Sequence, residues 1–394
     1  MIFRSSSVLW ACPFRPFFLA TGVYAIVALA GWLGVLLVQW PVAEPFAPMR
    51  WHSHEMLYGM VSAAITGFLL TAMCNWTGAR PLAGRGLQAL FGLWLLGRIV
   101  MWLGAWLPGW LVATVDLSFL LVVAVYAGRV IIQARSWRNL VLIAVLMALW
   151  LGNLAFHLDW GNGALSPSGR PDLIALLLVV VLMTIIGGRI TPAFTRNWLQ
   201  RNGKPTDSVR TYRHLEYVTL GSMLGLLLAV VLNLASEWIG ILAALAGLCQ
   251  LLRLWFWSGW KARSDALVWI LHAAYAWIPI GLLLMAASSL TPQVPATAWI
   301  HALGTGAMGT LILAVMTRVS LGHTGRPLVL PDHAILIYWL ILAASVLRLA
   351  TALNWLTWQP GVLLTALIWA AAFAAFVLIY LPILTRPRAD GRPG

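Results

Sequence analysis

The sequence predicts an all-α polytopic membrane protein with twelve transmembrane helices. Three observations predict this fold class. Hydrophobic residues make up 61% of the 394 residues, charged residues only 9%, and apolar windows long enough for a membrane helix recur along the whole chain. Soluble domains have about 25% charged residues, and disordered chains combine few apolar residues with much charge. Both of these classes are therefore excluded.

The apolar windows give twelve segments, each able to cross a bilayer core about 30 Å thick. The predicted spans are 17–38, 55–77, 87–107, 109–129, 138–158, 172–194, 214–234, 237–257, 265–289, 297–318, 333–354 and 361–383. The first run is longer than a signal-peptide core and lacks an A-x-A cleavage site, so we expect this helix to be retained. Because no segment is long and polar enough for a soluble domain, residues 1–394 are predicted to form a single twelve-helix domain.

The net charge of +14 is explained by topology, so nucleic acid is not expected as a partner. With a cytoplasmic N-terminus, 18 lysines and arginines fall on the inner side and only Arg50 and Arg170 on the outer side. Both termini are therefore predicted to be cytoplasmic. Cys12, Cys74 and Cys249 map to the inner half, where thiols stay reduced and unpaired.

Helices two and ten contain a sequence repeat that continues into the loops after them. In 54–82 and 301–328 a histidine is followed five residues later by Gly59 or Gly306, and both stretches end in Arg-Pro-Leu. Helix six ends in a looser relative at 191–198, which would fit three four-helix repeats. The alternative is that Gly, Pro and Arg are simply common where membrane helices end at the cytoplasmic side.

Histidine is uncommon inside a membrane, where it usually acts as a ligand, a proton carrier or a buried hydrogen-bonding group. Four histidines lie at the outer ends of helices two, five and ten: His52, His54, His157 and His301. On a formed helix His52 and His54 would point about 200° apart, whereas an extended entry at Ser53 would let both bind one ion. The sequence alone leaves both arrangements open. A third possibility is that the two histidines lie at the membrane interface and bind no ligand.

His54 and His301 occupy matching positions of the repeat, so facing helices could hold a haem between two imidazoles. The chain has no C-x-x-C-H motif, and such a haem would be bound non-covalently. Arg348 is the candidate partner of a haem propionate. Arg98 lies at the depth of Asp116, and we expect these two to form an ion pair.

The other buried histidines, His52, His157 and His272, are candidate copper ligands because copper favours imidazole. Tyr275 follows His272 at i+3, on the same face of helix nine. This spacing permits either a phenol beside a metal-bound histidine or a hydrogen-bonded pair in the core.

Six motifs are spread over nearly the whole chain. They are P-F-R-P-F-F at 13–18, W-H-S-H-E-M-L-Y-G at 51–59, G-F-L-L-T-A at 67–72, N-W-T-G at 75–78, G-G-R-I-T-P-A-F-T-R-N at 187–197 and M-T-R-V-S-L-G-H-T-G-R-P at 316–327. Together they resemble the NnrS family, which comprises twelve-helix proteins of the bacterial inner membrane. Members contain haem and copper and are associated with nitric oxide metabolism and resistance to nitrosative stress.

The resemblance implies haem, of b type, and copper as cofactors, and nitric oxide or a related small molecule as a partner within the lipid bilayer. It places motif histidines at His52, His54, His157, His272, His301 and His323. His214 and His333 fall where the family pattern has no histidine. The resemblance assigns no reaction. Turnover would require an unidentified electron donor, because no donor domain is expected in this chain.

Haem histidines on helices two and ten also resemble the arrangement in the catalytic subunit of haem–copper oxidases and nitric oxide reductases. This is an analogy of architecture alone. The chain lacks the paired histidines and the His-x-x-x-Tyr or glutamate-rich sites of their second metal, so reduction of oxygen or nitric oxide is not implied. The alternative function is a secondary transporter of a metal, haem or small molecule. Twelve helices with a longer basic loop at 196–213 also describe many carriers.

Overall fold

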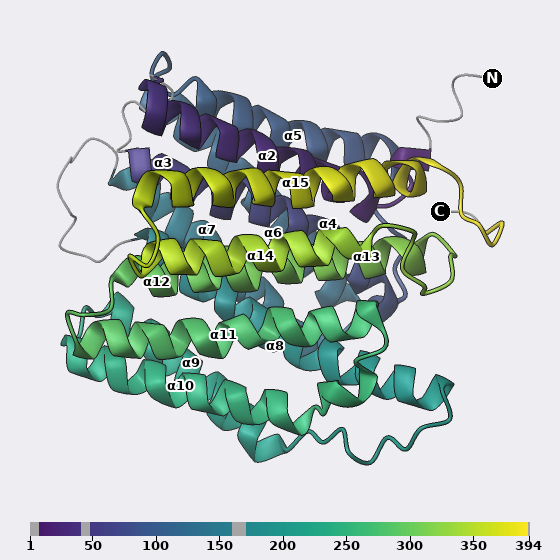
Figure 1. The fold of residues 1–394 in the computed structure, drawn as a ribbon. Helices are drawn as coiled ribbons and strands as arrows, with labels where there is room; N and C mark the ends of the chain where they lie inside the picture. The colour runs from purple at the N-terminus through teal and green to yellow at the C-terminus, as the bar shows by residue number, and fades with distance from the viewer. Residues whose placement is uncertain (1–7, 41–47, 160–170, 393–394) are drawn as a thin grey trace.

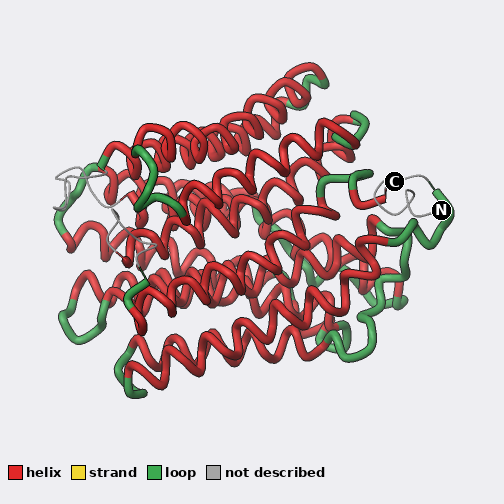
Figure 2. Tube along the Cα trace, turned by 90° about the horizontal axis from the view of Figure 1, so that it is seen from above, coloured by secondary structure: helices red, strands yellow, loops and turns green. Residues whose placement is uncertain are grey.

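The computed structural model describes residues 8–40, 48–159 and 171–392, and these ranges contain helices and loops but no β-strand. Figure 2 shows long helices running beside one another, with the loops gathered at the two ends of the bundle. The predicted all-α fold class is confirmed. Arg4 and Arg170, which entered the topology count, lie outside the described residues.

Twelve helical crossings follow one another along the described chain, each antiparallel to the next (Figure 1). Their bounds are α2 Phe14–Val38, α3 Pro48–His54 with the π-helix Glu55–Val61 and α4 Ser62–Thr77, α5 Gly84–Trp102, α6 Gly109–Gln133, α7 Leu140–Leu158, α8 Pro171–Arg201, α9 Arg213–Val231, α10 Ser236–Phe256, α11 Ala266–Leu290, α12 Ala296–His301 with the π-helix Ala302–Gly309 and α13 Thr310–His323, α14 Ile335–Ala352, and α15 Trp358–Thr385. Short 3₁₀ turns lie at Trp137–Asn139 and Gly259–Ala262.

Eleven of these crossings are long and apolar enough to span a membrane. The remaining crossing, α5, lies alongside them but is less apolar, since it carries Arg85, Gln88 and Arg98. α8 continues to Arg201 and α13 to His323, several residues past the predicted ends of their spans. The chain is therefore a multi-pass membrane protein whose helices project beyond the purely apolar windows.

The two ends of the bundle differ in the residues that they carry. At the end where α3 and α12 begin and α7 finishes, which we call the histidine end, lie His52, His54, His157 and His301. At the opposite end α4, α8, α13 and α15 finish, and most arginine-bearing loops join the helices. We call this the basic end.

The first and last helices lie side by side and close the bundle (Figure 1). Arg15 is buried there and donates from Nη1 to the backbone oxygen of Leu384 at 2.7 Å. Phe17, Phe18 and Phe376 are fully buried in the same core. Cys12, Cys74 and Cys249 are free thiols, as predicted.

The sequence repeat has a structural counterpart, because a π-helix follows His54 and another follows His301. A π-helix places a glycine close to the preceding crossing in both copies. A Cβ at Gly59 would lie 2.7 Å from Cε1 of Tyr24 in α2, and one at Gly306 would lie 2.6 Å from Cδ2 of Trp277 in α11. α8, the third proposed copy, is α-helical throughout.

π-Helical segments are frequent at functional sites. In both copies a side chain of the next crossing donates a hydrogen bond to a backbone carbonyl of the π-helix. Trp94 Nε1 of α5 donates to Gly59 O at 3.0 Å, and Ser345 Oγ of α14 donates to Thr305 O at 3.2 Å. Helices one to three and nine to eleven therefore share a π-helix after the histidine and a contact to it from the following crossing.

Candidate metal centre

His54 ends α3, and its ring lies inside the bundle with 1% of the residue exposed. Nε2 lies 3.1 Å from Oδ2 of Asp116 in α6 and 3.0 Å from Oδ1 of Asn153 in α7. Nδ1 lies 2.9 Å from Oε1 of Glu55. Side chains from the second, fourth and fifth crossings thus converge on this one imidazole.

Asp116 joins the second histidine to the first. Its Oδ2 lies 3.0 Å from Nε2 of His157 and accepts a hydrogen bond of 2.7 Å from Nδ2 of Asn153. Its Oδ1 accepts a hydrogen bond from Arg98, so the predicted Arg98–Asp116 ion pair is confirmed. All of these side chains are buried.

Arg98 also links the two carboxylates. Its Nη1 lies 2.5 Å from Oε1 of Glu55, whose other oxygen accepts a hydrogen bond from the hydroxyl of Tyr24. Trp102 Nε1 donates to the same hydroxyl oxygen at 2.9 Å. We call the group formed by His54, Glu55, Arg98, Asp116 and His157 the acid–histidine cluster.

The cluster lacks one positive charge. Its two carboxylates and one guanidinium leave a formal charge of −1 when both imidazoles are neutral. Both ring nitrogens of His54 face carboxylate oxygens, and Nε2 also faces the amide oxygen of Asn153. A ring in this position is satisfied by a proton on each nitrogen or by a metal ion in place of one of them. Burying the uncompensated charge would be costly.

The donor set fits a metal ion. One ligand atom from each of His54, Asp116 and His157 lies within 4.8 Å of the others. Two ligands about 2.0 Å from one tetrahedral ion would lie about 3.3 Å apart. The observed separations of 3.1 and 3.0 Å between Asp116 Oδ2 and the two imidazole nitrogens are close to this value. Two imidazoles and a carboxylate suit copper, zinc or iron.

The second group of histidines lies at the same end of the bundle. His301 Nε2 lies 2.9 Å from Nη2 of Arg348, and its Nδ1 lies 2.8 Å from the oxygen of Thr297. Because a guanidinium only donates, Nε2 is the acceptor and Nδ1 carries the proton. His52 stacks on Trp32 with ring centroids 4.7 Å apart, and it lies within electrostatic range of Arg348 and His301.

His52 and His54 point to different partners because residues 48–54 form an α-helix. The extended entry at Ser53 that would let both rings bind one ion is therefore not observed. His52 Nδ1 is buried and has no hydrogen-bond partner among the described residues. His54 and His301 likewise belong to different groups, and the predicted haem between these two rings stays a prediction.

The other candidate histidines lie elsewhere. His272 contacts Oγ1 of Thr195 at 2.8 Å, whereas Tyr275 bonds Gln250 and Arg253, so this pair has separate partners. His323 lies at the basic end, where its ring meets that of Phe14 at 5.6 Å. His214 is exposed in the first turn of α9, and His333 lies in the loop before α14.

Sequence reasoning missed Glu55 of the cluster and the neighbouring Tyr24 and Asn153. The depth of each residue could have suggested Asn153, since it lies one helical turn before His157. The hydropathy pattern does not predict which helices face one another.

These features define a multi-pass helical membrane protein with a buried histidine–carboxylate centre. The family model described as NnrS protein matches residues 8–388, nearly the whole chain. The protein therefore belongs to the NnrS family, and in general terms it is associated with the nitric oxide response. No curated protein matches the chain.

Proposed function

We propose that this protein binds copper and a non-covalent b-type haem in the bacterial inner membrane and acts there in the response to nitrosative stress. It would bind or process nitric oxide or an iron-nitrosyl species. One observation carries the proposal: His54, Asp116 and His157 bring two imidazoles and a carboxylate together in the interior of an apolar bundle. Ionisable groups at such depth are costly and usually functional.

Copper is the ion that we place at the acid–histidine cluster. A cuprous ion brings a single positive charge, which would neutralise the formal charge of −1 left by Glu55, Asp116 and Arg98. Imidazole nitrogen suits copper. Asn153 and Arg98 would orient the carboxylate from outside the ligand set, as hydrogen-bonded neighbours of metal ligands do.

Haem is placed at the second group. His301 holds its proton on Nδ1 against the Thr297 carbonyl, which leaves Nε2 as the nitrogen with a lone pair. Arg348 donates to that lone pair in this structure, so it would have to turn away from Nε2 for iron to bind there. Arg348 supplies a cation for a propionate, and His52 offers a buried nitrogen nearby. When bound, haem or copper would supply the metal that binds nitric oxide, an apolar molecule that can enter from the lipid.

The basic end is taken to face the cytoplasm, because basic residues concentrate on cytoplasmic loops. Both termini would then be cytoplasmic, and the two histidine groups would lie near the outer face. An electron donor, if one acts, would have to reach them from that face or through the membrane. No electron-transfer partner is identified by these residues.

The proposal is tested with His157→Ala in the full chain purified from membranes. Copper per protein should fall at least tenfold, because the ion loses one of three ligands and outer contacts alone change affinity by about 10–100-fold. His214→Ala is the matched control, since His214 is exposed on α9. Equal copper in both variants would contradict copper binding at the cluster.

The metal content of the same purified protein distinguishes a resident cofactor from the cargo of a carrier. A folded wild-type protein without copper or haem would favour the secondary transporter, whose ligands bind cargo only transiently. Stoichiometric metal retained through detergent exchange would favour a resident cofactor.

A further inference from the structure

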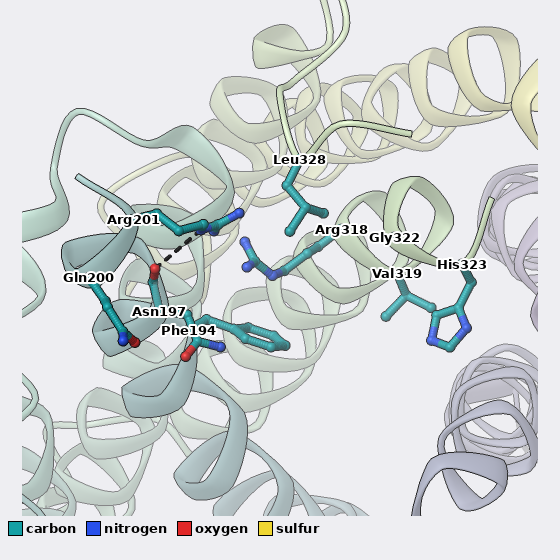
Figure 3. Close-up of a pocket in the computed structure, with 9 residues that line it drawn as sticks. All are labelled: Phe194, Asn197, Gln200, Arg201, Arg318, Val319, Gly322, His323 and Leu328. Carbon is teal, nitrogen blue, oxygen red and sulfur yellow. Dashed lines mark hydrogen bonds between the residues drawn. The ribbon is translucent and has the colours of Figure 1, made fainter. Parts of the chain in front are cut away.

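A cavity of about 460 Å³ lies at the basic end, far from the acid–histidine cluster along the bundle axis. Figure 3 shows it between α8, which contributes Phe194, Asn197 and Arg201, and α13, which contributes Arg318. These residues belong to the two motifs at 187–197 and 316–327 or lie just beyond them. Neither motif has a role in the proposed metal sites.

Arg318 is the unusual residue of this cavity. Only 5% of it is exposed, and its Nη1 is buried without a hydrogen-bond partner among the described residues. The guanidinium carbon lies 4.0 Å over the ring of Phe194, and the close-up shows the group directed toward the α8 side of the cavity. A guanidinium has five donors, and leaving them unmet when buried costs free energy.

The charges around Arg318 leave the cavity positive. Arg201 lies within electrostatic range of Arg318, and its Nε donates to the backbone oxygen of Asn197 at 3.2 Å. Asp265, just before α11, is a carboxylate within electrostatic range of both arginines, and among the described residues it forms a close ion pair with neither. Two guanidiniums against one carboxylate give a formal charge of +1.

The rest of the lining is mostly apolar. Phe194 and Val319 form part of the wall, and Leu328 from the loop after α13 lies across the cavity from them (Figure 3). A cavity of 460 Å³ falls within the range of about 300–1,000 Å³ that holds organic ligands, and it is much larger than a single inorganic anion needs. The occupant should therefore combine an anionic group with an apolar part.

We propose that this cavity binds a phosphate group, with Arg318 as its principal partner and with the apolar wall holding the adjoining part of the molecule. Arginine matches phosphate oxygens with two parallel hydrogen bonds. Basic pockets between membrane helices at the cytoplasmic side are suited to anionic lipid headgroups. The position at the bilayer surface and the apolar wall favour a phospholipid over free phosphate.

The test uses the full chain, stripped of lipid in detergent and titrated with phosphatidylglycerol under native mass spectrometry. Arg318→Gln should weaken binding of the tightest lipid about tenfold, as expected for one charge-assisted contact. Arg129→Gln is the matched control, because Arg129 is an exposed arginine of α6 outside the cavity. Phosphatidylcholine should bind both variants and the wild type equally.

A second variant distinguishes a loss of lipid binding from a folding defect in Arg318→Gln. Val319→Trp keeps both arginines but fills the cavity, and it should weaken the same lipid adduct. A parallel titration with inorganic phosphate distinguishes the two sources: competition that depends on Arg318 assigns the site to free phosphate, and no competition assigns it to the lipid. Unchanged phosphatidylglycerol binding in both Arg318→Gln and Val319→Trp would overturn the proposal. Copper and haem contents should be unaffected, so failure here leaves the proposed function untouched.

Discussion

Arg348 donates to Nε2 of His301, at the place where Arg98 in the other half of the repeat binds the carboxylates beside His54. Each arginine lies on the crossing that follows its histidine. In one half the histidine meets acidic partners, and in the other it meets the arginine directly. The same scaffold thus presents one imidazole in an anionic setting and one in a cationic setting, as two different metal centres would require.

Removing the Arg348 contact should affect haem and leave copper unchanged. We expect Arg348→Gln to weaken haem retention about tenfold or more, because a hydrogen bond to a charged group contributes about 1.5–3 kcal/mol. The pyridine haemochrome assay on purified protein measures haem per chain. Arg129→Gln should retain the wild-type content. Equal haem contents in Arg129→Gln and Arg348→Gln would show that Arg348 is not part of the haem site.

Asp116→Asn should lower both stability and copper content. The substitution keeps the shape of the side chain and leaves Arg98 paired with Glu55, but it removes the charged acceptor shared by Arg98, His54 and His157. Loss of hydrogen bonds to a charged group costs about 1.5–3 kcal/mol. Thermal unfolding in detergent, followed by circular dichroism, reports the loss. Asp207→Asn, on an exposed loop, is the control. A variant as stable as this control would mean that the cluster does not hold its four crossings together.

The glycine of the second π-helix should not tolerate a methyl group. A Cβ at Gly306 would lie 2.6 Å from the Trp277 ring, whereas one at Gly304, two residues earlier, meets no atom within 4 Å. Gly306→Ala should therefore destabilise by about 1–3 kcal/mol, the usual cost of overpacking. Gly304→Ala should be close to neutral. Equal stabilities would show that the approach of α11 to this π-helix is not tight.

Anion binding in the basic cavity should tighten as the pH falls. Burial raises the pKa of Asp265, so this carboxylate is neutralised at a higher pH than an exposed aspartate. The charge opposing Arg318 and Arg201 is then lost. Asp265→Asn should bind phosphatidylglycerol more tightly at pH 7 and show a smaller pH dependence than wild type. Asp265 is the N-cap residue of α11 but makes no side-chain capping hydrogen bond, so asparagine is tolerated at this position.

Hydropathy predicted the number and order of the crossings, because each helix must bury a similar length of apolar residues. The sequence also predicted the repeat around His54 and His301 and the Arg98–Asp116 pair, since depth in the membrane follows from position in the helix. It did not predict that His54 would meet Glu55 and Asn153. Lateral contacts depend on how helices rotate about their axes, and almost uniformly apolar helices leave that rotation unspecified.

The most direct test of the account is a visible spectrum of the purified full chain with parallel iron and copper analysis, before and after dithionite and nitric oxide. The account predicts low-spin haem bands, copper near one per chain and a spectral shift on adding nitric oxide. It also predicts that His157→Ala loses copper but keeps the haem bands. A folded, colourless protein that holds neither iron nor copper would contradict the account.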